Sequence, residues 1–401
     1  MGDTVSEGDV VDEGGDVDGD GEESADLRVG AVGMGIGHLH LLCWLGVRGA
    51  SAVAVADTDD DRRNGAAMAW NLPAVETLDE LLDLGVDIVD LCTPPAGHEE
   101  QILRCLDAGV HVICEKPLVG SVAACDRLAG AVAAAEARAG ARLMPIQQYR
   151  FGDGAARARA LVEADITGRL FTASASTWWR RDRDHYDESP WRGTWGSALG
   201  GTVVNHAIHI HDLLTWIGGP LVELQAQMAT RVNDTDTEDC AVAIGRTADG
   251  GLVTLNATTG AATESSRLVW HFEHVTIESS TEAYDPAKGP WRFDFRSPDA
   301  ERRAAEVWDG FAPVPNLYSG QFQAFVDALP HGPLPVTLAD AAATLELVTA
   351  FYTSARTGEH QTLPLALDHP ARGGWAPRPP DRARADGPPT AQRPAVDHGP
   401  A

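Results

Sequence analysis

Several features that mark membrane, secreted or nucleic-acid-binding proteins are missing from this sequence. No apolar run reaches the ~18 residues that a transmembrane helix requires, so no membrane-spanning segment is expected. The first residues are acidic and rich in glycine, the opposite of a secretory signal peptide. Basic side chains are scarce, because 31 Lys and Arg stand against 59 Asp and Glu, for a formal net charge of −28. This balance argues against nucleic acid and anionic membrane surfaces as partners.

Paired cysteines are missing as well. The six cysteines form no C-x-x-C pair and are scattered through apolar stretches, at positions 43, 92, 105, 114, 125 and 240. This spacing indicates reduced thiols in a protein core rather than a disulfide framework. We therefore expect a cytoplasmic protein.

What the sequence does contain points to a large globular protein with low-complexity ends. A length of 401 residues and an apolar content of 44% suggest two domains, or three at most. Residues 1–26 hold eleven acids and no Lys or Arg, and residues 368–401 hold eight prolines and five arginines. Both ends are predicted to be disordered tails. The ordered chain is predicted to form one domain over 27–148 and a second over 149–367.

A glycine-rich turn opens the first predicted domain. A short apolar strand over 27–32 leads into Gly33-Met34-Gly35-Ile36-Gly37, and an apolar helix follows over 41–46. Strand, glycine-rich turn and helix are typical of a dinucleotide site, where the backbone approaches a pyrophosphate at the helix N-terminus. The third glycine comes one residue earlier than in the usual G-x-G-x-x-G, so a plain tight turn is the alternative interpretation.

An acidic residue follows at the position expected for ribose recognition. The strand predicted over 51–56 ends in Asp57, about 20 residues beyond the glycines, where a carboxylate accepts hydrogen bonds from ribose hydroxyls. Three further acids, Asp59 to Asp61, would repel a 2′-phosphate, which favours NAD as the cofactor. Arg62 and Arg63 could turn toward such a phosphate, so NADP is the alternative.

The rest of the first domain alternates strands with helices, which predicts a doubly wound parallel sheet. Strands are predicted over 86–92, 110–114 and 142–146, and helices over 78–84, 99–108 and 121–139. Thr93-Pro94 and Glu115-Lys116-Pro117 directly follow two of these strands, at the carboxyl edge where such sheets bind ligands. An amine there loses its proton near neutral pH if it is desolvated or faces another cation. An exposed Glu-Lys pair that merely closes the strand is the alternative.

The second predicted domain is an α/β unit with a large open, mostly antiparallel sheet. Its strands, joined by turns such as Asp249-Gly250-Gly251, are predicted over 171–179, 224–228, 240–246, 251–257, 267–273 and 274–278. Helices are predicted over 155–164, 318–329 and 338–353. The broad face of such a sheet suits subunit pairing. A loop over 180–195 carries Arg, Tyr and Trp side chains, which either pack ordinarily or hold a polyhydroxylated ring.

Three histidines and an aspartate cluster in one predicted helix, as His206, His209, His211 and Asp212. At helical spacing, Asn205, His209 and Asp212 share a face. A zinc site is one interpretation of such a cluster. We expect no metal, because no distant Cys or His cluster supports one and nicotinamide chemistry does not need it.

Together these motifs resemble the glucose–fructose oxidoreductase/inositol dehydrogenase family, Gfo/Idh/MocA, over about residues 27–365. The matching residues are the turn Gly33–Gly37, Asp57, Thr93-Pro94 with His98, Glu115-Lys116-Pro117, Arg150, and Gly200-Gly201 followed by Asn205, His209 and Asp212. The resemblance implies a Rossmann domain with a C-terminal α/β domain, paired into homodimers or homotetramers through the open sheet. It also implies NAD(P)-dependent hydride transfer at a hydroxyl of a sugar, nucleotide sugar or inositol-like polyol.

The resemblance also implies roles for individual residues. Lys116 is the expected catalytic lysine, with His209 as its acid/base partner and Asn205 in a position often held by Asp or Asn. The expected cofactor contacts are Gly33, Gly35, Ile36, Gly37, Asp57, Thr93, Pro94, His98, Glu115 and Lys116. The expected substrate contacts are Arg150, Tyr186, Trp191, Arg192, Asn205, His206 and His209.

Two departures from the family pattern bear on these expectations. The early third glycine could change the geometry of cofactor binding. Leu199-Gly200-Gly201 stands where three glycines are usual, which could change the substrate-binding end of the site.

Two alternative functions are also considered. One is a redox-assisted elimination that recycles NAD, and the other is a cofactor-binding regulator without turnover. A regulator would be expected to lose the Lys116 and His209 pair, which this chain keeps.

Overall fold

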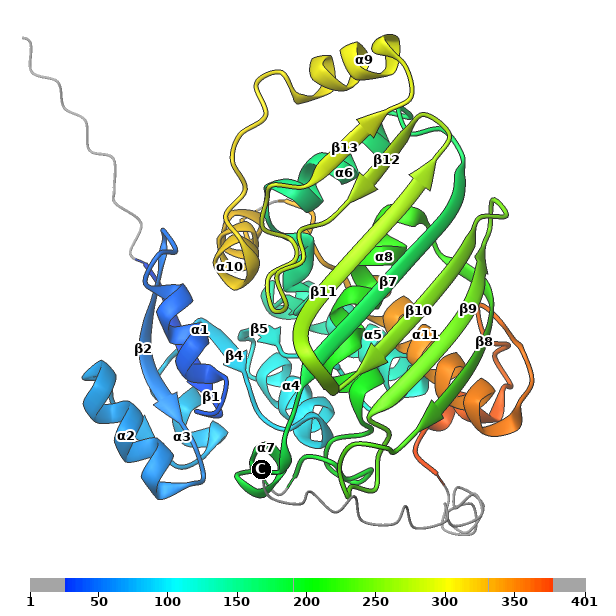
Figure 1. The fold of residues 1–401 in the computed structure, drawn as a ribbon. Helices are drawn as coiled ribbons and strands as arrows, with labels where there is room; N and C mark the ends of the chain where they lie inside the picture. The colour runs from blue at the N-terminus through cyan, green and yellow to red at the C-terminus, as the bar shows by residue number, and fades with distance from the viewer. Residues whose placement is uncertain (1–25, 190, 331, 378–401) are drawn as a thin grey trace, which may run out of the picture.

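The structure, a computed structural model, describes residues 26–189, 191–330 and 332–377. Its helices and strands form two parts, each built on one β-sheet (Figure 1). The predicted acidic tail, apart from Asp26, and residues 378–401 of the predicted C-terminal tail lie outside the described residues. Within the described ranges, no helix is long and apolar enough to cross a membrane.

A six-stranded parallel sheet forms the N-terminal part. Its strands, in the order β3-β2-β1-β4-β5-β6, are β1 (Leu27–Val32), β2 (Ala50–Ala56), β3 (Ala74–Val75), β4 (Ile88–Leu91), β5 (His111–Cys114) and β6 (Leu143–Pro145). They are short apolar runs, as expected of strands covered on both faces. The strand order reverses between β1 and β4, where a crevice opens at the carboxyl ends. The predicted doubly wound sheet is confirmed.

Helices connect these strands and cover the sheet. They are α1 (Gly37–Trp44), α2 (Asp60–Trp70), α3 (Leu78–Asp83), α4 (His98–Asp107) and α5 (Val122–Ala139). α1 begins at Gly37, earlier than the predicted residue 41, because the glycine turn passes into the helix directly after Ile36. Ser121 caps α5, since its hydroxyl accepts a hydrogen bond from the Ala124 amide.

One helix from the C-terminal half completes the N-terminal part. α10 (Leu317–Ala328) packs beside α1, where the rings of Phe322 and Trp44 stack with centroids 4.4 Å apart. The same core includes Ile88 of β4 and Ile113 of β5. The chain therefore returns to the first sheet before the second sheet is complete, so a single boundary after residue 148 does not separate the two parts.

An eight-stranded sheet forms the second part. Its strands, in the order β13-β12-β11-β7-β10-β9-β8-β14, are β7 (Leu170–Arg180), β8 (Leu221–Ala229), β9 (Cys240–Thr247), β10 (Leu252–Thr258), β11 (Gly260–Phe272), β12 (Val275–Glu278), β13 (Arg292–Phe295) and β14 (Gln361–Thr362). All neighbours are antiparallel except β7 and β10. The mostly antiparallel sheet is confirmed, but β10 does not pair with β11, the next strand along the chain, because the earlier strand β7 lies between them.

Helices cover one face of this second sheet, and no helix of the described residues covers the other, which we call the bare face (Figure 1). α8 (Ile208–Gly218) packs on β7 and α11 (Leu338–Thr357) on β8, while α6 (Asp153–Glu163) contacts α9 (Pro298–Trp308). Along β9 and β10, buried residues alternate with exposed ones, as in a sheet with one solvated face. We define the outer patch as the exposed apolar residues of the bare face: Trp178, Val242, Ile244 and Leu252.

The ordered chain extends further than the sequence predicts. Residues 368–377, assigned above to a disordered tail, include a short helical turn over Pro370–Gly373 that packs against both α5 and α11. Arg372 forms ion pairs with Asp126 and Glu346, and the Trp375 ring stacks on Tyr352. The proline-rich composition of the tail predicted disorder, but the contacts of Arg372 and Trp375 hold this segment in place.

Candidate active site

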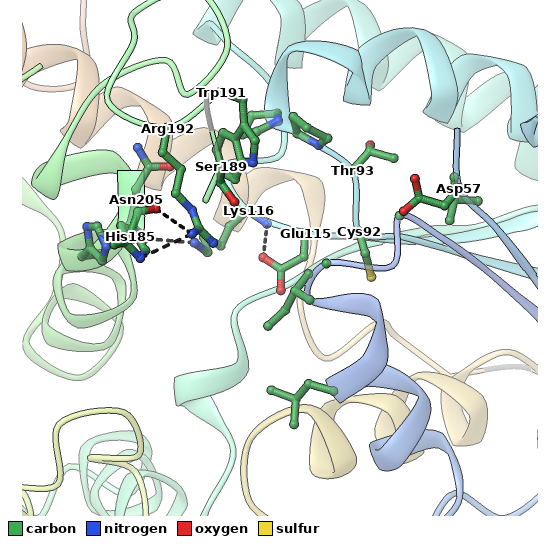
Figure 2. Close-up of a pocket in the computed structure, with 18 of the residues that line it drawn as sticks. Asp57, Cys92, Thr93, Glu115, Lys116, His185, Ser189, Trp191, Arg192 and Asn205 are labelled. Carbon is green, nitrogen blue, oxygen red and sulfur yellow. Dashed lines mark hydrogen bonds between the residues drawn. The ribbon is translucent and has the colours of Figure 1, made fainter. Parts of the chain in front are cut away.

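A cavity of about 880 Å³ opens at the carboxyl edge of the six-stranded sheet, between the two parts. Its volume lies toward the upper end of the range for ligand pockets. Residues of the glycine turn and Asp57 line one end, and residues of α8 and the 181–193 loop line the other. Figure 2 shows Lys116 between these ends, with Asp57 and Thr93 on one side and Arg192, His185 and Asn205 on the other.

The glycine turn leaves the backbone accessible where a dinucleotide needs it. Gly33 has φ +92°, and a Cβ there would lie 2.8 Å from the Cys92 carbonyl carbon. Gly35 and Ile36 line the cavity, and a Cβ on Gly35 would meet nothing within 4 Å, so space remains for a pyrophosphate at the start of α1. Gly37 is not among the lining residues. It packs against Met34, so its expected cofactor contact is replaced by a role in close packing of the helix.

Asp57 is held rigidly at the end of β2. Its carboxylate accepts hydrogen bonds from the Met34 amide at 2.7 Å and the Asp59 amide at 2.9 Å. The remaining lone pairs face the cavity, where ribose hydroxyls could donate to them. Arg63 is engaged elsewhere, by Asp60 and the Asp57 carbonyl, whereas Arg62 lines the cavity. These groups fit the adenosine end of NAD.

Lys116 presents a desolvated amine to the centre of the cavity. Its Nζ donates a hydrogen bond to the Asn205 carbonyl oxygen at 3.0 Å, and its backbone amide donates to the Glu115 carboxylate at 3.0 Å (Figure 2). Burial lowers the pKa of the Lys116 amine, the charge of Arg192 lowers it further, and Glu115 opposes both. The neutral amine, which can accept a proton, is therefore more accessible than in a solvated lysine.

A buried network that the sequence analysis missed supports Glu115 from behind. Its Oε1 accepts a hydrogen bond from the Tyr318 hydroxyl at 2.8 Å and lies 3.3 Å from His40 Nε2. His40 Nδ1 lies 3.0 Å from Asp90 and 3.2 Å from the Cys92 sulfur. Burial alone would lower the pKa of His40, but Asp90 and Cys92 raise it well above its usual value. The histidine thus acts as the cation that compensates two buried carboxylates.

His40, Asp90 and Cys92 could also hold a metal ion by geometry alone, since their ligand atoms lie within 4.8 Å of one another. The hydrogen bonds among them, with one from the Trp44 indole to Asp90 at 2.8 Å, already engage His40 Nδ1 and the Asp90 carboxylate. The other candidate metal site is the cluster of His206, His209, His211 and Asp212. There, both Asp212 carboxylate oxygens already accept hydrogen bonds from Arg150, at 2.7 and 2.8 Å.

The predicted histidine helix begins with a π-helical turn over Val203–Ala207 before α8. Such turns occur often at functional sites. The Asn205 side-chain amide donates to three backbone carbonyls, so its backbone oxygen, rather than its side chain, contacts Lys116. Gly201 is required here, because a Cβ would lie 1.7 Å from the Glu238 carbonyl oxygen. Glu238 accepts from the Gly201 and Val203 amides and anchors the turn.

His206 and His209 both line the cavity. The His209 ring lies beside Tyr149, with centroids 4.9 Å apart, and its Nδ1 has no partner within the described part of the chain. Burial and then the charge of Lys116 lower the pKa of His209 well below its usual value. Burial thus favours a neutral imidazole at His209, and both His209 and Lys116 line the cavity.

The aromatic loop closes the other end of the cavity. Tyr186, Trp191 and Arg192 line it, as the resemblance implied. The Arg192 guanidinium lies over the Trp191 ring, 5.3 Å from its centroid, and Nη1 donates to the His185 carbonyl oxygen at 3.2 Å. α7 (Arg183–Asp187) positions His185 and Tyr186.

Besides Gly37, two more expected contacts, Arg150 and His98, lie outside the cavity lining. Arg150 is buried and forms ion pairs with Asp212 and Asp340, so the expected substrate contact is replaced by a structural role. His98 is buried too, and its ring nitrogens lie 2.8 Å from the Thr93 carbonyl oxygen and 3.0 Å from the Pro117 carbonyl oxygen. It ties together the two turns that carry Thr93 and Lys116, instead of contacting the cofactor.

Other lining residues were not singled out from the sequence. They include Gln148, Tyr149, Trp179, Arg181, Tyr284 and Tyr318. Gln148 and Tyr149 follow β6 at the same carboxyl edge as Lys116, so strand ends could have pointed to them. Tyr284 and Tyr318 come from segments distant in sequence, and no local pattern marks them.

Comparison with known proteins places this fold and site in one family. A family model described as an oxidoreductase family with an NAD-binding Rossmann fold matches residues 27–143, and the Gfo/Idh/MocA C-terminal domain matches residues 155–278. The chain belongs to the Gfo/Idh/MocA oxidoreductase family. This Gfo/Idh/MocA protein is thus an NAD-binding oxidoreductase, and the early third glycine does not remove it from the family.

Similar proteins include inositol 2-dehydrogenase 2 of Paenarthrobacter aurescens, which is 26% identical over 77% of this chain and 89% of its own length. Inositol 2-dehydrogenase 1 of Saccharopolyspora erythraea is 39% identical, but the match spans only 25% of this chain and 32% of that relative. Among solved structures, the WlbA dehydrogenase from Bordetella pertussis in complex with NADH and UDP-GlcNAcA has a TM-score of 0.74. It is 26% identical, and the match covers 85% of this chain and 100% of that one.

Proposed function

We propose that this protein is an NAD-dependent dehydrogenase acting on a secondary hydroxyl of a sugar, nucleotide sugar or inositol-like polyol. The observation that carries the proposal is the desolvated Lys116 amine, which faces the cavity with a neutral His209 beside it. Names of similar proteins support the substrate class, since they include inositol 2-dehydrogenases and a dehydrogenase crystallised with UDP-GlcNAcA.

In the proposed mechanism, NAD supplies the hydride acceptor or donor when bound, held by Gly33, Gly35, Asp57, Thr93 and Pro94. During oxidation the Lys116 amine accepts the hydroxyl proton or polarises the oxygen, and its lowered pKa makes the neutral form available. His209, a neutral imidazole that lines the same cavity, then exchanges the proton with Lys116. In the reverse direction both groups return the proton to the oxygen.

We infer a preference for NAD over NADP from the Asp57 end of the cavity. The Asp57 carboxylate and the neighbouring Asp59 would repel a 2′-phosphate, and Arg63 is held by Asp60. Titration of NADH and NADPH against tryptophan fluorescence tests this inference. Tighter NADH binding supports it, and Asp57→Ala should then lose the preference. Tighter NADPH binding would assign the 2′-phosphate to Arg62 and contradict the inference.

We propose that the protein is a homodimer or homotetramer paired through the outer patch. Natural soluble proteins rarely leave several large apolar side chains together on an uncovered sheet face unless a partner covers them. Trp178, Val242, Ile244 and Leu252 form such a set. A cytoplasmic location, suggested by six unpaired cysteines, is proposed with it.

The decisive experiment for function is an assay of NADH formation with NAD⁺ and a panel of inositols, aldoses and nucleotide sugars. Net NADH formation with at least one of them, lost in Lys116→Met, supports the proposal. Consumption of a glycoside that needs NAD but yields no net NADH would instead identify the elimination reaction. If no member of the panel is converted in either way, the proposed function is wrong.

A further inference from the structure

Arg192 is a partly buried cation in the cavity, and no acidic side chain of the described ranges pairs with it. Other arginines of the same loop do have such partners: Arg180 pairs with Asp182, Arg181 with Glu264, and Arg183 with Asp187. Among the described residues, the hydrogen-bond partners of the Arg192 guanidinium are the His185 carbonyl oxygen at 3.2 Å and the His185 ring Nδ1 at 3.3 Å. A guanidinium keeps its proton at any ordinary pH, so this charge stays in place.

The neighbours of Arg192 add to its positive charge. Burial lowers the pKa of its guanidinium, Arg181 lowers it further, and Glu188 offsets these effects only partly. Arg192 in turn lowers the pKa of Lys116. A chain with a net charge of −28 thus collects Lys116, Arg181 and Arg192 at one end of one cavity. Such focusing of one sign in a cleft attracts ligands of the other sign.

The shape of the site also suits an anion. The Trp191 ring and His185 hold the guanidinium from two sides, yet only Nη1 donates to protein atoms among the described contacts. The other N–H groups of the planar fork match the two oxygens of a carboxylate or a phosphate. We propose that the substrate carries an anionic group, a carboxylate or a phosphate, and that Arg192 binds it.

The proposal rests on the proposed function, because it assigns a substrate class to the same cavity. The cofactor pyrophosphate is a second anion to consider. Figure 2 places Arg192 beside Lys116 and Asn205, whereas Asp57 lies at the far side of the view. The pyrophosphate belongs at the glycine turn near Gly35, so Arg192 lies at the substrate end.

The test measures equilibrium binding to the NADH-saturated protein by isothermal titration calorimetry. The probes are D-glucuronate for a carboxylate, D-glucose 6-phosphate for a phosphate, and neutral D-glucose. At least one acidic probe should bind about tenfold or more tightly than glucose, the size of a typical hydrogen bond to a charged group. The acidic probe that binds more tightly identifies the anionic group as a carboxylate or a phosphate. Arg192→Gln should abolish this preference, and Arg192→Lys should keep part of it.

Arg183→Gln is the matched control. Arg183 lies on the same loop and is exposed, so this variant removes one positive charge without touching the cavity lining. It should keep the preference for the acidic probe. Equal affinity for acidic and neutral probes, no binding of either acidic probe, or weaker NADH binding in Arg192→Gln would each overturn the proposal.

The outcomes also separate this proposal from the proposed function. If neutral polyols are oxidised with NAD⁺ and neither acidic probe binds, the proposed function is supported and the proposed anion site is wrong. If an acidic probe binds through Arg192 but no sugar or polyol is converted, the anion site is supported and the proposed dehydrogenase function is wrong.

Discussion

The Nε2 atom of His40 lies 3.3 Å from Oε1 of Glu115, so a histidine of helix α1 supports the carboxylate next to Lys116. The other ring nitrogen of His40 lies 3.0 Å from Asp90. Both carboxylates and the ring are buried, and the raised pKa of His40 marks it as the compensating cation. Burial would raise the pKa of Glu115, but the hydrogen bond from His40 and the charge of Lys116 hold it well below its usual range. Helix α1, which carries His40, and the segment after β5, which carries Glu115 and Lys116, are thus joined by one ionic network.

Replacing His40 with Phe should destabilise the protein by about 3–5 kcal/mol, because Glu115 and Asp90 then stay buried without their cation. The raised folded pKa of His40 means that its stabilising charge is fully present below pH 6.5. This contribution to stability is lost as the pH rises through the pKa of His40 in the folded protein. Urea unfolding across pH measures it, and the cost of the variant should shrink at high pH. His38→Phe, on the same helix, should cost much less. A pH-independent cost would contradict the account of His40 as a cation.

His211 should make the protein less stable in mild acid. Its imidazole is buried against Phe351, and burial lowers its pKa from 6.5 to about 4. Because the unfolded chain binds the proton more readily, stability should fall as the pH drops from 6.5 to 4, on the order of 3 kcal/mol from this residue. His211→Phe should flatten this part of the urea-unfolding profile. A variant profile as steep as that of the wild type would show that His211 takes no part.

Trp375 should anchor the segment beyond residue 367. It is 1% exposed, it stacks on Tyr352, and its indole donates to the Leu199 carbonyl beside Gly200. Trp375→Ala should therefore cost about 3–5 kcal/mol, as for other buried aromatic side chains. The control is Leu367→Ala, since Leu367 is 89% exposed and should cost little. Thermal unfolding of both variants measures the two costs. If Trp375→Ala were as stable as Leu367→Ala, Trp375 would not anchor the segment.

Ile244→Lys should weaken subunit pairing. Ile244 is 60% exposed in the outer patch, and it pairs in register with Gln225 and Thr254 on the neighbouring strands. A charge placed inside an apolar interface is costly unless it finds a partner. Sedimentation velocity should show an oligomer for the wild type and a shift toward monomer for the variant. Thr276→Lys, near the sheet edge, serves as the control. A monomeric wild type would contradict pairing through the outer patch.

Much of the fold could be predicted because short-range patterns determine it. Apolar runs that end in Asp57, Thr93 and Glu115 mark β2, β4 and β5, and their common parallel direction brings these residues to one edge. The insertion of β7 between β10 and β11 could not be read from the sequence, because the strand order depends on contacts between segments 80 residues apart or more in register. The return of α10 to the first sheet is hidden for the same reason.

Local motifs of the sequence mark several residues that the structure brings together, whereas long-range contacts could not be predicted. Lys116, His209 and Arg192 line one cavity together with Gly33 and Gly35, and their roles in binding and catalysis stay predictions. Arg150 and His98 carry the right chemistry, but Asp212 and the two turn carbonyls engage them. His40 and Tyr318 meet Glu115 from positions 75 residues before it and 203 residues after it, and no spacing rule could connect them.

Replacement of Lys116 tests the central claim most directly. The chain has only two lysines, so Lys288→Met, on an exposed turn, is a matched control for Lys116→Met. With a substrate identified by the panel, kcat and the Kd for NADH would be measured for the wild type and both variants. Lys116→Met should lose ~10²–10⁴ in kcat, with NADH affinity nearly unchanged, and Lys288→Met should match the wild type. Turnover by Lys116→Met at the wild-type rate would contradict the assignment of Lys116 as the catalytic group.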